Sequence, residues 1–61
     1  MIKPTILIIE DDPDQLENLN EMLNAQFNPI LAQSGQEAIE KYANTTKNIE
    51  IILSEIVDAF S

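Results

Sequence analysis

The stretch Ile6-Leu7-Ile8-Ile9-Glu10-Asp11-Asp12-Pro13 decides how the rest of this 61-residue chain folds. Its four aliphatic residues are continuous rather than alternating with polar ones, which predicts a short strand covered on both faces, as in a parallel sheet. The acids that follow end this strand. Asp12 is placed to cap a helix beginning at Pro13, because its carboxylate accepts hydrogen bonds from free backbone N–H groups and proline is well tolerated at the first helical position.

Beyond Pro13 the apolar residues recur every three or four positions, which is the period of a helix with one buried face. Asp14 complements the helix dipole, and Gln15 occupies the position that completes a capping box. The residues expected to face the core are Leu16, Leu19, Met22, Leu23 and Phe27. We interpret this stripe as core packing in preference to a partner-binding face.

A second strand and a second helix follow. Residues 30–32 are apolar, and Pro29 in front of them predicts a strand at an edge of the sheet, because proline cannot donate to a strand ladder. Ser34-Gly35-Gln36-Glu37 predicts a second capping box, and Glu37 and Lys41 are spaced to pair on the outer face of the helix. The residues expected to be buried are Ala38, Ile39, Tyr42 and Ala43.

A third apolar segment completes the pattern. Residues 49–53, interrupted by Glu50, predict a strand. The resulting order β-α-β-α-β, with short connections, predicts an α/β fold in which right-handed crossovers build a small three-stranded parallel sheet. We expect one domain spanning residues 1–61, without repeats or an internal boundary.

The composition disfavours several classes of function. Eleven Asp plus Glu against three Lys plus Arg give a net charge of −8, which repels nucleic acid and anionic lipid. The chain has no cysteine and no histidine, so a disulfide framework and a zinc site are both excluded, and a cytoplasmic location is expected. The longest apolar run, residues 6–9, is too short to span a membrane.

Three carboxylates follow strands that we expect to be neighbours. Glu10 and Asp11 come directly after the first strand, and Glu55 lies near the end of the third. Since ligands of parallel α/β sheets bind beyond the carboxyl ends of the strands, these side chains form a candidate Mg²⁺ site. In the alternative interpretation they are solvated loop acids, and Asp12 and Asp14 are present only to start a helix.

These segments together resemble the N-terminal half of a two-component response-regulator receiver domain of the chemotaxis type. The resemblance rests on the stretch from Ile6 to Pro13, on Leu31-Ala32-Gln33-Ser34-Gly35-Gln36-Glu37-Ala38 and on Ile51-Ile52-Leu53-Ser54-Glu55-Ile56, which are in register along nearly the whole chain. It implies a truncated flavodoxin-like fold with strand order 2-1-3, in which the second strand is an edge.

The resemblance also implies roles for individual residues. Glu10 and Asp11 match the acidic pair that holds Mg²⁺, and the main-chain carbonyl of Val57 matches a further metal ligand. Glu55 matches the aspartate that accepts a phosphoryl group from a sensor histidine kinase and that also contacts the metal. The implied partners are such a kinase or another receiver or regulator protein. No enzymatic activity is expected.

The chain departs from the family pattern at the phosphoacceptor. Glu55 replaces the aspartate, and its extra methylene moves the carboxylate outward by about 1.5 Å, a shift that near-attack geometry penalises strongly. A glutamate imitates the phosphorylated state only in part, because it carries one negative charge where a phosphorylated side chain carries about 1.5 to 2. Asp58 is a weak substitute acceptor because it falls out of register.

The chain is also about half the length of a complete receiver, whose later part carries the switch hydroxyl and the lysine that pairs with the phosphoryl group. Lys3, Lys41 and Lys47 are not placed to replace that lysine.

Three interpretations remain open from the sequence. The first is a truncated or degenerate pseudo-receiver in phosphorelay signal transduction. The second is a simple divalent-cation-binding acidic module, and the third is a non-functional fragment of a longer protein. In each of them the outer edge of the third strand is unpaired, so we expect a homodimer through that edge, partial disorder, or dependence on a complementary segment.

Overall fold

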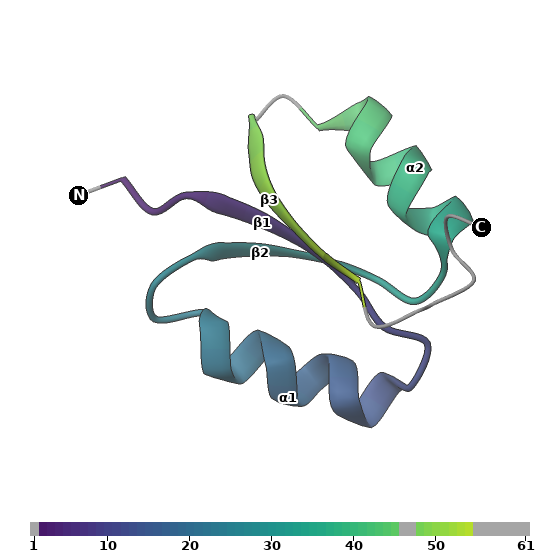
Figure 1. Ribbon diagram of the computed structural model, residues 1–61, viewed down its shortest axis with the longest axis horizontal. Helices are drawn as coiled ribbons and strands as arrows, with labels where there is room; N and C mark the ends of the chain where they lie inside the picture. Colours follow the sequence, from purple (N-terminus) through teal and green to yellow (C-terminus); the bar gives the residue numbers. More distant parts are fainter. Residues whose placement is uncertain (1, 46–47, 55–61) are drawn as a thin grey trace.

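The computed structural model describes residues 2–45 and 48–54 of the chain. They form two helices and three strands that alternate along the sequence (Figure 1). The elements are β1 (Thr5–Ile9), α1 (Pro13–Leu23), β2 (Asn28–Ala32), α2 (Gly35–Asn44) and β3 (Ile49–Ser54). The predicted β-α-β-α-β order is therefore confirmed. The observed ends of the strands lie within two residues of the expected ones.

The three strands form one parallel sheet in the order β2-β1-β3, as predicted. The continuous apolar run becomes the central strand, and all five of its residues are buried. Pro29 lies on the edge strand β2 and pairs with Ile6 of β1. Its missing N–H is tolerated because, within the described residues, no strand lies on the outer side of β2. The chain is thus an α/β fold that matches a truncated flavodoxin-like topology.

The two helices cover opposite faces of the sheet (Figure 1). Leu16 of α1 packs on one face against Ile6 and Ile8, and Ala38 of α2 packs on the other face against Leu7 and Ile9. Each face also holds partly buried residues, which are Leu19, Leu23, Phe27, Leu31 and Leu53 on the α1 face and Ile30 and Ile49 on the α2 face. Alternate residues of β1 therefore supply two separate cores.

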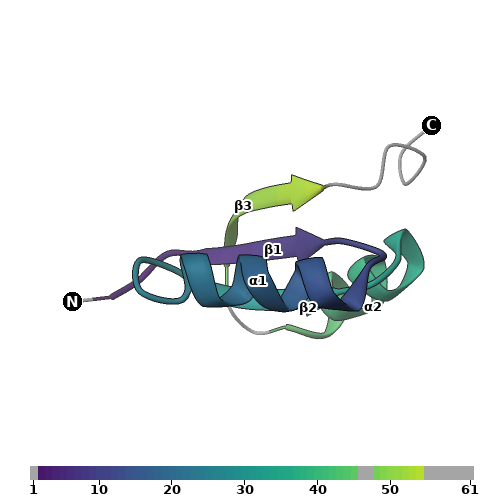
Figure 2. The same ribbon diagram turned by 90° about the horizontal axis from the view of Figure 1, so that it is seen from below.

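Several residues expected in the core are exposed instead. Met22 is 71% exposed, Ile39 is 65% exposed and Tyr42 is 56% exposed, and Ala43 is also exposed. The physical reason is the width of the sheet. Both helices make their main contacts with β1 and β2, and Figure 2 shows α1 lying across these two strands with β3 beyond it. The outer part of each apolar stripe consequently has no layer to pack against.

A β-bulge in β3 changes which residues share a face. Thr5 pairs with Ile49 and Ile6 pairs with Ile51, so Glu50 is the extra residue. Beyond the bulge Ile52 pairs with Leu7. Since paired residues in a sheet point to the same side, Ile51 belongs to the α1 face and Ile52 to the α2 face.

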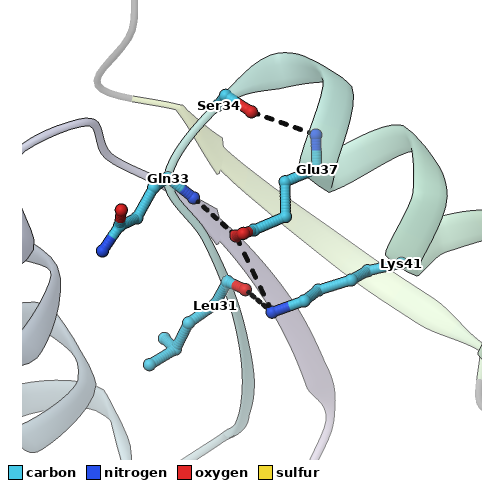
Figure 3. A network of polar contacts seen from close by, with 5 residues as sticks. All are labelled: Leu31, Gln33, Ser34, Glu37 and Lys41. Atoms are coloured by element: carbon cyan, nitrogen blue, oxygen red, sulfur yellow. Dashed lines mark hydrogen bonds and ion pairs between the residues drawn. The ribbon is translucent and has the colours of Figure 1, made fainter.

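Side-chain caps start both helices. Ser34 Oγ accepts a hydrogen bond from the backbone N–H of Glu37 at 3.1 Å, as a capping box requires. The Glu37 carboxylate reaches back to the N–H of Gln33 at 2.9 Å, one residue before the cap (Figure 3). It also lies 3.8 Å from Lys41 Nζ, which confirms the expected i,i+4 pair. Glu37 thus joins the start of α2 to the end of β2.

Candidate functional site

The carboxyl end of β1 carries the candidate site. Because the strands are parallel and β1 is central, residues that follow it are flanked by the ends of β2 and β3. The N–H of Glu10 donates to the carbonyl of Ala32 at 3.0 Å, so the pairing of β1 with β2 continues one residue past the strand. Ser54, the last described residue of β3, pairs with Ile9. The three strand ends are therefore level with one another.

Glu10 is a buried carboxylate with an internal partner. It is only 6% exposed, and its Oε1 accepts a hydrogen bond from the backbone N–H of Asp12 at 3.1 Å. A buried carboxylate without such a donor would be costly, so this bond helps to account for a charged residue at the end of the central strand. One carboxylate oxygen of Glu10 is thereby committed to holding the turn between β1 and α1.

Asp12 is the cap of α1, as the sequence predicts. Its Oδ1 accepts from the N–H of Asp14 at 2.9 Å and from the N–H of Gln15 at 3.4 Å. Asp12 itself has extended backbone angles, and Pro13 stands at the first helical position. Both features are typical of a helix start, so the carboxylate of Asp12 has a structural role that explains its presence.

Asp11 differs from the acids on either side of it. Its side chain is exposed, and within residues 2–45 and 48–54 it makes no hydrogen bond or ion pair. Of the three consecutive acids, Asp11 is thus the one whose carboxylate has no partner among the described residues. The position directly after the central strand is also the one at which parallel α/β sheets bind their ligands.

The structure tests only part of the predicted metal site. Glu10 and Asp11 lie together at the carboxyl end of β1, whereas Glu55 and Val57 fall outside the described residues. Within the described part of the chain, no three Asp, Glu, His or Cys side chains are grouped closely enough to hold a metal ion. Mg²⁺ binds through as few as one or two carboxylates and keeps several waters, so a site for this ion does not require three grouped side chains.

The described lysines are engaged with backbone carbonyls. Lys3 Nζ donates to the carbonyl of Asn24 at 3.1 Å, in the turn that connects α1 with β2. Lys41 Nζ donates to the carbonyl of Leu31 and lies beside the Glu37 carboxylate (Figure 3). Lys41 therefore lies on the outer face of α2, as predicted, and also reaches the end of β2. Lys47 lies outside the described residues.

The sequence did not predict a second surface feature, an apolar hollow between α2 and β3. It has a volume of about 130 Å³ and is lined by Leu7, Ile9, Ala38, Ile39, Tyr42 and Ile52. Helical periodicity marks Ile39 and Tyr42 as apolar positions of α2 but cannot show that the sheet beneath them is too narrow to bury them. We call this feature the α2–β3 hollow.

Comparisons with protein-family models, with curated proteins and with solved structures find no match to this chain. Within the described residues, neither helix has the length and apolar character needed to cross a membrane.

Proposed function

We propose that this chain is a degenerate receiver-like module of two-component phosphorelay signalling. It acts by binding a sensor histidine kinase or another receiver or regulator protein, and it does not catalyse a reaction. The observation that carries the proposal is the position of Glu10 and Asp11 directly after the central strand of a parallel sheet ordered β2-β1-β3. The sequence resemblance assigns the same two residues to the Mg²⁺-binding acidic pair.

Glu10 and Asp11 differ in their hydrogen bonds and in their exposure. Glu10 is buried and holds the turn, while Asp11 is exposed and has no partner among the described residues, which supports Asp11 as the main protein ligand of Mg²⁺. When bound, Mg²⁺ would neutralise the phosphoryl oxygens of an incoming donor. This chain's own contribution is to place one free carboxylate at the strand end and to keep the neighbouring turn rigid.

Glu55 makes the module degenerate. Phosphoryl transfer depends on in-line positioning of the attacking oxygen, and the longer glutamate side chain displaces that oxygen. Its fixed negative charge gives a weak and permanent imitation of the phosphorylated side chain. The module therefore works as a constant binding surface that does not switch by phosphorylation.

Magnesium binding is tested first. In a ¹H–¹⁵N correlation spectrum of the 61-residue chain, millimolar Mg²⁺ should shift the amides around Glu10 and Asp11. The Asp11→Asn variant should bind Mg²⁺ at least about 10-fold more weakly, because loss of even an outer-shell partner of a metal ligand typically costs about 10–100-fold. Asp14→Asn is the matched control, because Asp14 is another exposed acid only three residues away. An equal loss in both variants contradicts a site at Asp11.

Labelling with acetyl phosphate separates a receiver-like module from a simple cation binder. An aspartate carboxylate oxygen attacks phosphorus and acetate leaves, which forms an acyl phosphate. We expect no labelling of the natural chain and Mg²⁺-dependent labelling of Glu55→Asp, measured by intact mass. Adding Asp11→Asn to that variant should abolish the label. Label on Glu55→Asp that persists without Mg²⁺ or with Asp11→Asn contradicts the receiver assignment, and label on the natural chain contradicts its degeneracy.

A further inference from the structure

The α2–β3 hollow lies on the opposite face of the sheet from α1. Its floor is formed by Leu7 and Ile9 of the central strand, one wall is α2, and Ile52 of β3 bounds the other side. Among the described residues, no charged side chain lines it. Such a surface has no role in phosphate or metal chemistry, since neither ligand gains from apolar surroundings.

The walls of this hollow are more exposed than a folded core requires. Ile39 is 65% exposed, Tyr42 is 56% exposed and Ile52 is 52% exposed. These three large side chains come from two different elements and surround a single depression. Isolated exposed apolar residues need no explanation, but a contiguous and concave group of them marks a binding surface.

The dimensions of the layers indicate what fits there. Strands are spaced by about 4.8 Å and a helix with its side chains is about 10 Å wide, so one helix covers about two strands. On this face α2 makes its main contacts with β1 and β2, and within the described residues no helix lies above β3. Parallel sheets are covered on both faces, so a helix lying alongside α2 over β3 would complete this layer.

The charge of the chain distinguishes between candidate helices. The net charge is −8, and the exposed acids Glu40 and Glu50 belong to the two elements that form the walls. Lys3 and Lys41 are already engaged with backbone carbonyls. A second copy would bring another charge of −8 to the same surface, which opposes self-association, whereas a basic segment is attracted.

We propose that the α2–β3 hollow docks an amphipathic helix of a partner protein, with an apolar stripe that fills the hollow and lysine or arginine residues on its flanks. This inference identifies the chemistry of a partner for the module proposed above. It uses none of the acids at the end of β1, so the Mg²⁺ and labelling experiments can fail without affecting it, and the reverse also holds.

Two synthetic helical peptides test the proposal. They share one leucine stripe with i, i+3, i+4 spacing, and their flanking residues are lysine in one and glutamate in the other. Titrated into the ¹⁵N-labelled 61-residue chain, the lysine peptide should shift amides of α2 and β3 and bind more weakly as salt is raised. The glutamate peptide should not bind.

Two variants locate the binding surface. Ile52→Thr keeps a β-branched residue in the strand but removes apolar surface, and it should weaken binding about tenfold, or about 1.4 kcal/mol. Ile39→Gln, on the exposed side of α2, should weaken binding to a similar extent without disturbing the sheet. Met22→Gln is the matched control, because Met22 is 71% exposed and belongs to α1 on the opposite face. It should leave binding unchanged.

The following results would overturn the proposal. If neither peptide shifts the α2 and β3 amides at millimolar concentration, the hollow has no affinity for a basic helix. If both peptides bind equally, charge does not select the partner. If Met22→Gln weakens binding as much as Ile52→Thr, the peptide lies elsewhere. If sedimentation at low salt shows a dimer that Ile52→Thr dissociates, the occupant is a second copy of this chain.

Discussion

Replacing Asp12 by alanine tests whether the turn between β1 and α1 is held as the structure shows. The substitution removes one carboxylate oxygen that accepts from two backbone N–H groups, Asp14 at 2.9 Å and Gln15 at 3.4 Å. Both donors belong to the first turn of α1, where N–H groups have no partner within the helix. Alanine leaves these donors to water and removes a negative charge from the positive end of the helix dipole.

The structure sets the size of this effect. Loss of a helix cap costs about 1 kcal/mol, within a range of about 0.5–2, and the dipole interaction adds about 0.3–1 kcal/mol at an exposed site. Removing one charge from a chain of −8 relieves some repulsion and offsets a little of the loss. We therefore expect a net cost of about 1 kcal/mol, a large part of the roughly 3–5 kcal/mol that a single core of this size supplies.

Urea unfolding followed by circular dichroism measures this cost. With a slope of about 1 kcal/mol per molar urea for a small chain, the midpoint of Asp12→Ala should fall by about 1 M. Asp12→Asn keeps the accepting oxygen and loses only the charge, so its midpoint should fall by less than half as much. Asp11→Asn is the matched control, and its unfolding free energy should change by no more than about 0.5 kcal/mol because the side chain is exposed and unpaired within the described residues.

The urea midpoints of these three variants distinguish the hydrogen bonds of the cap from the effect of the charge. If Asp12→Ala and Asp11→Asn have the same midpoint, the Asp12 carboxylate does not cap α1. If Asp12→Asn is as unstable as Asp12→Ala, the charge matters and the hydrogen bonds do not.

Two further substitutions test the packing of β1 and the polar contacts of α2. Ile8 is fully buried, so Ile8→Ala should lower the free energy of unfolding by about 2–5 kcal/mol and remove the helical circular dichroism signal. Ile8→Val should lower it by only about 0.5–1.5 kcal/mol. Similar spectra for both variants contradict a packed core at this position. Lys41→Met removes an exposed ion pair with Glu37 and the hydrogen bond to the Leu31 carbonyl. The urea midpoint should therefore fall by no more than the equivalent of about 1 kcal/mol. A larger loss means that these polar contacts are needed for the stability of α2.

Local patterns made most of the fold predictable. The unbroken apolar run of β1 indicates a strand buried on both faces, and all five residues of the strand are buried. Pro29 indicates an edge strand, and β2 is one. Asp12 and Ser34 indicate helix starts, and both act as caps. Each of these signals depends on only a few neighbouring residues, so the sequence contains all that is needed to interpret it.

The features that the sequence did not predict depend on distant parts of the chain. Tyr42 and Met22 occupy apolar positions of their helices, but their exposure follows from a sheet of only three strands, which helical periodicity cannot reveal. The bulge at Glu50 is set by pairing with β1 and reassigns the isoleucines of β3 between the faces. The different roles of Glu10 and Asp11 follow from one hydrogen bond in the turn. The composition of Glu10-Asp11-Asp12 alone cannot distinguish an exposed carboxylate from one that caps a helix.

The bulge and the net charge both oppose the homodimer that the unpaired outer edge of β3 predicts. This edge has no paired strand within the described residues, and such an edge is a template for self-association unless something opposes it. Glu50 interrupts the regular pairing geometry and places a carboxylate in the edge strand, while the charge of −8 repels a second copy over about 10 Å at moderate salt. Neither the bulge nor the negative charge hinders a basic helix. Such a helix carries the opposite charge, and it would contact only the side chains of the α2–β3 hollow. If a basic helix docks in the α2–β3 hollow as proposed, the same two features oppose self-association without opposing that helix.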